Sequence, residues 1–324
     1  MHSIPELQAI IKKTFDLASF SQEPAELYDP ITYTLNLGGK RIRPLLVLIG
    51  CDLFDGDPEK AGAAALAIEL FHNFTLLHDD IMDKAPLRRG KETVYKKWNT
   101  NVAILSGDTM FALACEYLSR SDPDVLPYLF SEFTRTARMV CEGQQYDMNF
   151  EYRKVVTIGE YLEMIRLKTA VLIGCSLKLG ALLAHAPVDE TTKIYTFGEN
   201  IGMAFQLQDD LLDVFGDEQK FGKEIGRDIL SGKKTFLLLK AYEIAPEKER
   251  IELDQCFSDQ FIPSEEKILR VKNIYQSLKI REITLEEIEK YFAQALQSCD
   301  GINVDEKNKK VLRLFANDLL KRDF

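Results

Sequence analysis

The sequence predicts an all-α protein, a single large helical bundle across residues 1–324. Three observations support this fold class. Apolar residues recur with helical spacing along most of the chain. No segment combines apolar–polar alternation with β-branched enrichment and a hairpin turn signal. The breaks between helical segments are short, and none is rich enough in Pro or Ser to be an interdomain linker.

Each predicted helix follows from its own composition. Residues 59–83 contain no Pro and no Gly beyond Gly62, and they are rich in Ala and Leu, which favour helix. Residues 160–186 and 196–216 are apolar on nearly all sides, which predicts helices at the centre of a bundle. From about Ala245 the chain is more charged, and amphipathic residues 285–297 predict peripheral helices. The breaks between helices fall at 36–44, 84–93, 121–127 and 215–226.

The bulk composition excludes several classes of protein. The chain is 46% hydrophobic and 28% charged, which is globular, and its net charge of −10 argues against a general nucleic-acid binder. Six scattered cysteines form no CxxC pair and predict buried thiols in a reducing compartment. The N-terminus lacks a signal-peptide pattern, and the longest apolar stretch, residues 170–184, contains Lys178 and is too short to span a membrane. We therefore expect a cytoplasmic protein without a membrane span.

Two aspartate motifs of identical DDxxD spacing are the strongest chemical signal. The first is "DDIMD" at 79–83 and the second is "DDLLD" at 209–213, and each follows a long apolar helix. Carboxylates one helical turn apart repel one another by a few tenths of a kcal/mol, so such a pattern needs a compensating ligand. Magnesium accepts one or two carboxylates and completes its octahedron with water and phosphate oxygens. The motifs therefore predict metal ions held around a diphosphate by Asp79, Asp80, Asp83, Asp209, Asp210 and Asp213.

Basic side chains stand near both motifs, as binding of a diphosphate requires. Arginine suits phosphate because its planar fork donates two hydrogen bonds at once. A lysine within the apolar segment "RLKTA" is costly unless it is paired, and one histidine lies two helical turns before the first motif. The "GGKRIRP" segment lacks the P-loop pattern. The candidate cations are Lys40, Arg41, Arg43, His72, Arg88, Arg89, Lys168, Lys223 and Lys233.

Taken in order, these motifs resemble the trans-isoprenyl diphosphate synthases, the polyprenyl synthetase family. The resemblance runs through "GGKRIRP", "LLHDDIMD", "RRG", "GDTMFALA", "EGQQYD", "RLKTA", "AFQLQDDLLDVFGD" and "GKKT". It implies a helical bundle around a deep central cavity, a homodimer, and three magnesium ions in each active site. The implied reaction joins isopentenyl diphosphate head to tail to an allylic diphosphate, namely dimethylallyl, geranyl or farnesyl diphosphate.

The same resemblance implies a role for individual residues. The two aspartate motifs would bind the metal ions. The allylic diphosphate would be held by Arg88, Lys168, Lys223 and Lys233. Isopentenyl diphosphate would be held by Lys40, Arg43, His72 and Arg89. The reacting end would be lined by Thr169 and Gln206, with Gln144 nearby.

The chemistry of the residues agrees with these roles. Ionisation of an allylic diphosphate leaves a carbocation, and metal ions and cationic side chains neutralise the charge that grows on the leaving group. Oxygens of Thr169, Gln206 and the Lys168 carbonyl would stabilise the cation, and no side-chain base is evident for the final proton. This chain reads "RRGKETVY" where members of the family often read "RRGxPTVH", so Glu92 and Tyr95 replace Pro and His.

The residues before the first motif predict the length of the product. Phe74, five positions before Asp79, matches the geranylgeranyl type of floor beneath the growing chain, and Thr75 is small where many farnesyl-type enzymes have an aromatic residue. A helical wheel instead points Thr75 and Phe71 along the aspartate face. Both possibilities remain open, and we expect a product of fifteen to twenty carbons, with twenty favoured.

Two other functions remain as alternatives. A class I terpene cyclase ionises one substrate and has no need for the isopentenyl diphosphate residues. A non-catalytic helical partner subunit would keep the aspartates only as solvated charges.

Overall fold

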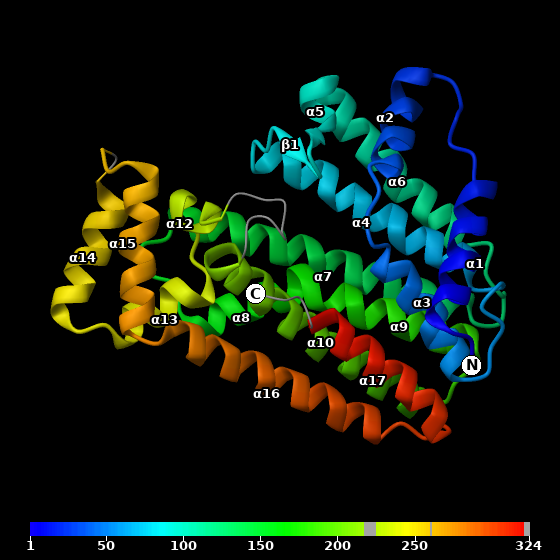
Figure 1. Ribbon diagram of the computed structural model, residues 1–324. Coiled ribbons are helices and arrows are strands. Elements are labelled where there is room, and N and C mark those ends of the chain that lie inside the picture. Colours follow the sequence, from blue (N-terminus) through cyan, green and yellow to red (C-terminus); the bar gives the residue numbers. More distant parts are fainter. Residues whose placement is uncertain (217–224, 260, 321–324) are drawn as a thin grey trace. The chain divides into compact units, whose positions relative to one another are not determined.

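The fold is almost entirely helical. It is a computed structural model that describes residues 1–216, 225–259 and 261–320. In these residues the only strands are β1 (Leu87–Arg88) and β2 (Lys91–Glu92), a short antiparallel pair that joins two helices (Figure 1). The predicted all-α fold class is therefore confirmed.

The chain forms two compact units. The first contains Met1–Thr134 and Cys175–Ile194, and the second contains Arg135–Gly174 and Tyr195–Phe324. The chain passes from one unit to the other within α7 (Leu126–Tyr152), α9 (Val171–Leu183) and α10 (Val188–Phe215). The single domain expected across residues 1–324 stays a prediction.

The first unit is built around two buried helices, α3 and α4. Every residue of α3 from Pro44 to Leu53 is buried, because this helix is apolar on nearly all sides. A Cβ atom placed on Gly180 would lie 2.0 Å from the Val47 carbonyl oxygen, so α9 contacts the backbone of α3 directly and only glycine fits. The helices of this unit are α1 (Ile4–Leu17), α2 (Ala25–Asn36), α3 (Ile42–Leu53), α4 (Gly62–Met82), α5 (Val94–Lys97) and α6 (Thr100–Leu118), with parts of α7, α9 and α10.

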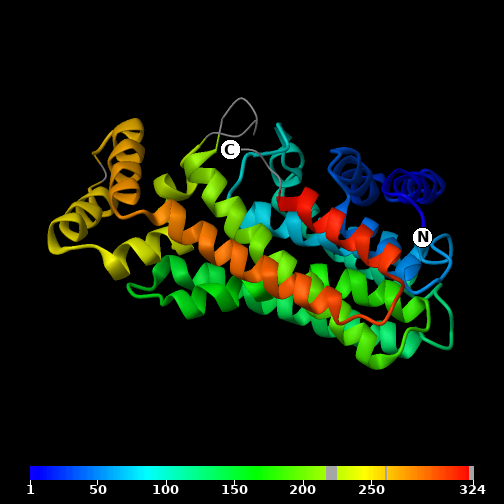
Figure 2. The ribbon, with the colours of Figure 1, turned by 60° about the horizontal axis from the view of Figure 1, so that its bottom comes forward.

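The second unit has its own hydrophobic core. Residues of α8, α10, α13, α14, α15 and α16 meet in it, and among them Leu207, Leu237 and Leu253 are completely buried. Helices α14 and α15 extend away from the long helix α16 (Figures 1 and 2). The remaining elements are α8 (Ile158–Ile165), the π-helical turn η1 (Arg166–Ala170), α12 (Arg227–Ser231), α13 (Phe236–Ile244), α14 (Glu247–Ser258), α15 (Ser264–Ser277), α16 (Ile280–Asp300) and α17 (Glu306–Leu320).

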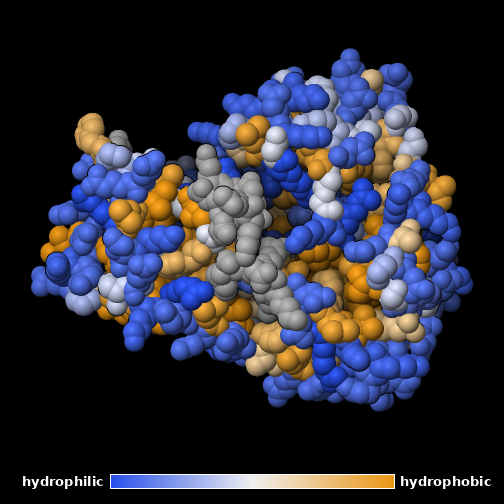
Figure 3. All heavy atoms as spheres, viewed as in Figure 1, coloured by the Kyte–Doolittle hydropathy of each residue, from blue (hydrophilic) through white to orange (hydrophobic). Residues whose placement is uncertain are grey.

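The visible surface is mostly polar. In Figure 3 hydrophilic side chains predominate, and hydrophobic residues form smaller patches among them. Within the described part of the chain, none of the helices has both the length and the apolar character needed to cross a membrane. All six cysteines are free thiols, but the prediction that all are buried is wrong for two of them, because Cys115 is half-buried and Cys141 lies exposed on α7.

Candidate active site

In the first unit, a glycine turn and the start of α3 bring basic residues together. Gly38 and Gly39 have φ values of 80° and 136°, which favour glycine. The guanidinium of Arg89 lies against this turn and donates a hydrogen bond to the Gly38 carbonyl. A Cβ on Gly39 would lie 2.9 Å from the Arg89 Cζ, so a side chain there would displace the guanidinium from the turn. Lys40 is exposed in the same turn.

Arg43 and His72 form the half-buried part of this basic cluster. Arg43, in the first turn of α3, lies with Nη1 3.1 Å from His72 Nε2 on α4. Burial lowers the pKa of His72 well below its ordinary value, and the neighbouring Arg43 and Arg89 lower it further. His72 is therefore neutral, and its Nε2 accepts from Arg43. Burial also lowers the pKa of Arg43 to about 10, although Glu69 opposes the change.

The Arg43 side chain has spare hydrogen-bonding capacity. Its Nε atom is buried and has no hydrogen-bond partner among the described residues. A buried N–H without an acceptor is costly, and a phosphate oxygen is a strong acceptor for it. The predicted isopentenyl diphosphate residues Arg43 and His72 are thus in contact, with Arg89 and Lys40 at the turn that precedes α3.

The first aspartate motif lies at the C-terminal end of α4. Asp79 is half-buried in the last turn, and Asp83 is exposed at the residue that follows the helix, where its N–H donates to the Asp79 carbonyl at 2.8 Å. Asp80 is only 4% exposed, and its Oδ1 accepts from Arg88 Nε at 2.8 Å. Burial raises the pKa of Asp80, and Arg88 opposes the rise. Arg88, predicted to hold the allylic diphosphate, is therefore also the partner of a motif aspartate.

The second aspartate motif lies near the C-terminal end of α10, in the second unit. Asp209 and Asp213 are half-buried, and Asp213 Oδ2 accepts from the Asp228 N–H in the first turn of α12 at 3.0 Å. Asp210 is 4% exposed and accepts hydrogen bonds from the Tyr161 hydroxyl and from Gln206 Nε2. The second aspartate of each motif is therefore buried and hydrogen-bonded to a neighbouring side chain.

The predicted reacting-end residues lie together in the second unit. Lys168 and Thr169 occupy the π-helical turn η1, where the ordinary helical hydrogen-bond pattern is interrupted. The Thr169 hydroxyl donates to Gln206 Oε1 at 3.0 Å. Lys168 Nζ donates to Asp147 Oδ2 at 2.7 Å, and Lys233 Nζ lies 3.8 Å from the same oxygen. Lys168 and Lys233, both predicted to bind diphosphate, thus meet at one carboxylate.

Sequence reasoning missed Asp147 as a functional residue. It is the last residue of "EGQQYD" on α7, one turn after the predicted Gln144. The signal that would have found it is the cost of an unpaired lysine in an apolar segment, which demands an acidic partner. Burial alone would raise the pKa of Asp147, but Lys233 and Lys168 outweigh it, so the pKa is lowered and Asp147 is a carboxylate at neutral pH.

Asp147→Asn is expected to lower the free energy of unfolding at pH 7 by about 1.5–3 kcal/mol, the value of a hydrogen bond to a charged group. The variant should lose less stability below pH 4, because the wild-type carboxylate contributes above its unfolded-state pKa and is protonated as the pH falls. Urea unfolding at both pH values measures this. Glu163→Gln, which removes an exposed partner of Arg166, is the control and should cost less than 1 kcal/mol. Equal losses in the two variants would contradict the pairing.

The predicted chain-length residues belong to an aromatic cluster in the first unit. Phe71 is 1% exposed, and its ring lies 5.4 Å from that of Phe133 and 6.1 Å from that of Phe111. Phe74 is half-buried, and its ring lies 5.6 Å from that of Phe111. The Thr75 hydroxyl donates to the His72 carbonyl of its own helix at 2.8 Å. The deeper of the two aromatic candidates is therefore Phe71.

Each motif offers the donors that magnesium prefers. Among the described residues, no three His, Cys, Asp or Glu side chains converge as ligands of a single metal ion. Asp79 with Asp83, and Asp209 with Asp213, instead provide carboxylates one helical turn apart. Because magnesium takes only one or two carboxylates and several water or phosphate oxygens, this donor set fits an ion that binds together with a diphosphate.

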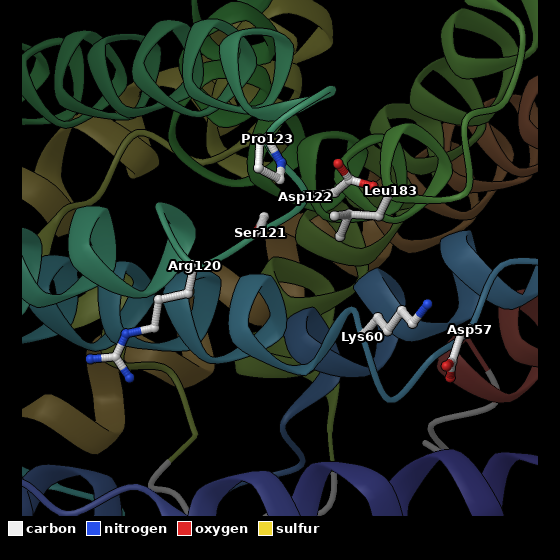
Figure 4. Close-up of a pocket in the computed structure, with 7 residues that line it drawn as sticks. All are labelled: Asp57, Lys60, Arg120, Ser121, Asp122, Pro123 and Leu183. Carbon is white, nitrogen blue, oxygen red and sulfur yellow. The ribbon is translucent and has the colours of Figure 1, made fainter.

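One predicted site residue falls outside the described part of the chain, and one recess lies apart from the described site residues. Lys223 and the C-terminal residues 321–324 lie outside the described residues. In the first unit, a recess of about 470 Å³ lies near the N-terminal end of α4, at the opposite end of this helix from Asp79. Lys60, Ser121, Asp122 and Leu183 are among the residues that line it (Figure 4). None of the predicted site residues that the structure describes lines this recess.

Comparisons with known proteins agree along nearly the whole chain. The model of the polyprenyl synthetase family matches residues 24–278. A geranylgeranyl diphosphate synthase of Saccharolobus solfataricus is 39% identical over 290 residues, which cover 88% of this chain and 87% of that protein. The geranylgeranyl pyrophosphate synthase of Geoglobus acetivorans is 39% identical over 305 residues, 93% of this chain and 92% of that protein. A crystal structure of a geranylgeranyl pyrophosphate synthase matches with a TM-score of 0.94 at 44% identity and covers 100% of both chains.

Proposed function

The chain belongs to the polyprenyl synthetase family and is a trans-prenyltransferase, and we propose that it makes geranylgeranyl diphosphate. It condenses isopentenyl diphosphate head to tail with an allylic diphosphate. The names of the similar proteins support a product of twenty carbons, as does the bulky Phe74 five positions before Asp79.

The cluster of Arg43, His72 and Arg89 is the observation that favours condensation over cyclisation. A cyclase ionises one diphosphate and needs no second cationic pocket. Here Arg43 contacts His72 at 3.1 Å, its buried Nε lacks a partner among the described residues, and Arg89 lies against the adjoining glycine turn. These donors suit the diphosphate of a second substrate, isopentenyl diphosphate.

The remaining site residues have roles that follow from their charge. Lys168 and Lys233, which meet at Asp147, bind the allylic diphosphate and neutralise the charge that develops as it departs. Arg88 and Lys223 belong to the same proposed set. Magnesium, when bound at the two aspartate motifs, supplies further neutralisation of this leaving group. Three ions per active site are part of the proposal.

The carbocation needs nearby oxygens that stabilise its positive charge, and the final proton needs an acceptor. Thr169 Oγ1, Gln206 Oε1 and the Lys168 carbonyl supply partial negative charge, with Gln144 nearby on α7. After the isopentenyl double bond attacks the cation, a proton must leave. The released diphosphate accepts it, because the side chains proposed for the reacting end include no general base.

Product analysis tests this function. Labelled isopentenyl diphosphate is incubated with magnesium and with dimethylallyl, geranyl or farnesyl diphosphate, and the products are identified by mass spectrometry. We expect geranylgeranyl diphosphate from each primer and no product from an allylic diphosphate alone. A cyclic hydrocarbon from the allylic substrate alone would favour the cyclase, and a product that stops at fifteen carbons would overturn the proposed length.

A binding measurement separates the enzyme from a non-catalytic subunit. Magnesium with inorganic diphosphate, at 100 times its dissociation constant, should raise the free energy of unfolding by about 2.7 kcal/mol. A melting temperature unchanged at saturating ligand would support the non-catalytic alternative.

The assembly and location of the protein are also part of the proposal. We expect a homodimer, which sedimentation equilibrium would detect as twice the chain mass. A cytoplasmic location is supported by the six free thiols, which are typical of a reducing compartment.

A further inference from the structure

A buried tyrosine is hydrogen-bonded to the second aspartate motif. Tyr161 lies on α8, is 1% exposed, and donates its hydroxyl hydrogen bond to Asp210 Oδ2. A capping box formed by Thr157 and Glu160 starts this helix, and Met164 and Ile165 anchor it in the core of the second unit. The tyrosine ring is therefore held in one place, and its hydroxyl is directed at a motif carboxylate.

The hydrogen bonds continue from Asp210 to the residues proposed for the reacting end. Asp210 Oδ1 accepts from Gln206 Nε2 at 3.1 Å, and Gln206 Oε1 accepts from the Thr169 hydroxyl at 3.0 Å. These two contacts place the Gln206 NH₂ group toward Asp210 and the Gln206 amide oxygen toward the Thr169 hydroxyl.

The orientation of this amide matters for a reaction that passes through a cation. An amide oxygen carries partial negative charge and stabilises a nearby carbocation, whereas the NH₂ group carries partial positive charge and destabilises it. If Asp210 turns about its terminal torsion, which is soft and roughly two-fold, the Gln206 amide is no longer held in one orientation. The Tyr161 hydroxyl opposes that rotation because it occupies the other carboxylate oxygen.

We propose that Tyr161 is a positioning residue of the prenyl transfer reaction, acting through Asp210 to hold the Gln206 oxygen toward Thr169. This inference rests on the proposed function. Tyr161 touches neither substrate nor metal in this scheme, and its effect appears in the chemical step and not in diphosphate binding.

The test compares two tyrosines that make the same kind of bond. Tyr242, on α13 of the same unit, has its hydroxyl 3.1 Å from Asp254 Oδ1 on α14, and neither residue belongs to a motif. Tyr161→Phe and Tyr242→Phe each remove one phenol–carboxylate hydrogen bond from the second unit. Measurements on the full chain are kcat, KM for both substrates, melting temperature, and the affinity for inorganic diphosphate with saturating Mg²⁺ by calorimetry.

We expect Tyr161→Phe to lower kcat by about fivefold to tenfold, the effect of one lost hydrogen bond. Its KM values and its diphosphate affinity should stay within about twofold of wild type. Tyr242→Phe should leave kcat unchanged at a comparable melting temperature. In a protein that already carries Gln206→Met, Tyr161→Phe should cause almost no further loss of kcat, because both residues belong to the same series of hydrogen bonds.

Three results would overturn the inference: unchanged kcat in Tyr161→Phe, additive losses with Gln206→Met, or a loss of diphosphate affinity that matches the loss of kcat. If Tyr161→Phe does not fold, 3-fluorotyrosine placed at residue 161 or 242 keeps the ring and alters only the strength of the donor. The fluorinated residue should change kcat when it stands at residue 161 and not when it stands at residue 242. An unchanged kcat at residue 161 would again overturn the inference. Absence of product from the wild-type protein would instead refute the proposed function.

Discussion

Asp83→Asn is expected to reduce kcat by about 10²–10³, the usual cost of removing one group that stabilises developing charge, while making the protein slightly more stable. Asp83 is exposed at the C-terminal end of α4, one turn from Asp79. A negative charge there opposes the helix dipole and repels the neighbouring carboxylate. Without ligand, its removal should therefore raise the free energy of unfolding by a few tenths of a kcal/mol.

The matched control for this variant is Asp16→Asn. Asp16 is an exposed aspartate in the last turn of α1, in the same unit. The Asp16→Asn variant should show the same small rise in the free energy of unfolding as Asp83→Asn, with no change in kcat. Steady-state kinetics and thermal melting in EDTA measure both quantities. Equal kcat in the two variants would show that Asp83 is only a solvated charge.

Phe71→Ala is expected to lower the free energy of unfolding by about 3–5 kcal/mol, because it empties the centre of the aromatic cluster. Phe71 is almost completely buried and contacts the rings of Phe74, Phe111 and Phe133. Phe74→Ala should cost less, since the Phe74 side chain is half-buried. If either ring forms the floor of the product cavity, its removal should yield products longer than twenty carbons. Urea unfolding and mass spectrometry of the products measure the two effects.

Phe197→Ala controls for instability alone. Phe197 is also fully buried, but it lies on α10 and outside the aromatic cluster. This variant should lose comparable stability and still make a product of wild-type length. An unchanged product length in both Phe71→Ala and Phe74→Ala would remove the floor hypothesis and leave these residues as ordinary core.

Both aspartate motifs share an arrangement that their identical spacing does not reveal. The second aspartate of each is 4% exposed and hydrogen-bonded, Asp80 to Arg88 and Asp210 to Tyr161 and Gln206. The first and last aspartates are more exposed. In the proposed site, the first and last carboxylates are thus better placed to approach a metal ion, and the middle ones orient neighbouring side chains.

Much of the fold could be predicted because the spacing and propensity that favour a helix are visible in neighbouring residues of the sequence. The apolar segments at 59–83 and 196–216 correspond to α4 and to the later part of α10, and the order of the motifs predicted the family that residues 24–278 match. The π-helical turn at Arg166–Ala170 was not predicted, because it interrupts a segment whose composition is continuous helix. The hairpin at residues 87–92 has strands of only two residues, too short for any alternation to appear.

The sequence by itself determined the helical class, the positions of the two carboxylate motifs and the types of residue that bind diphosphate. Helix propensity, apolar spacing and charge are properties of neighbouring residues and can be read along the chain. Only the tertiary structure decided that Lys168 pairs with Asp147, that Tyr161 donates to Asp210, and that Phe71 is buried more deeply than Phe74. These contacts join residues on different helices, and their geometry is set by how the helices pack.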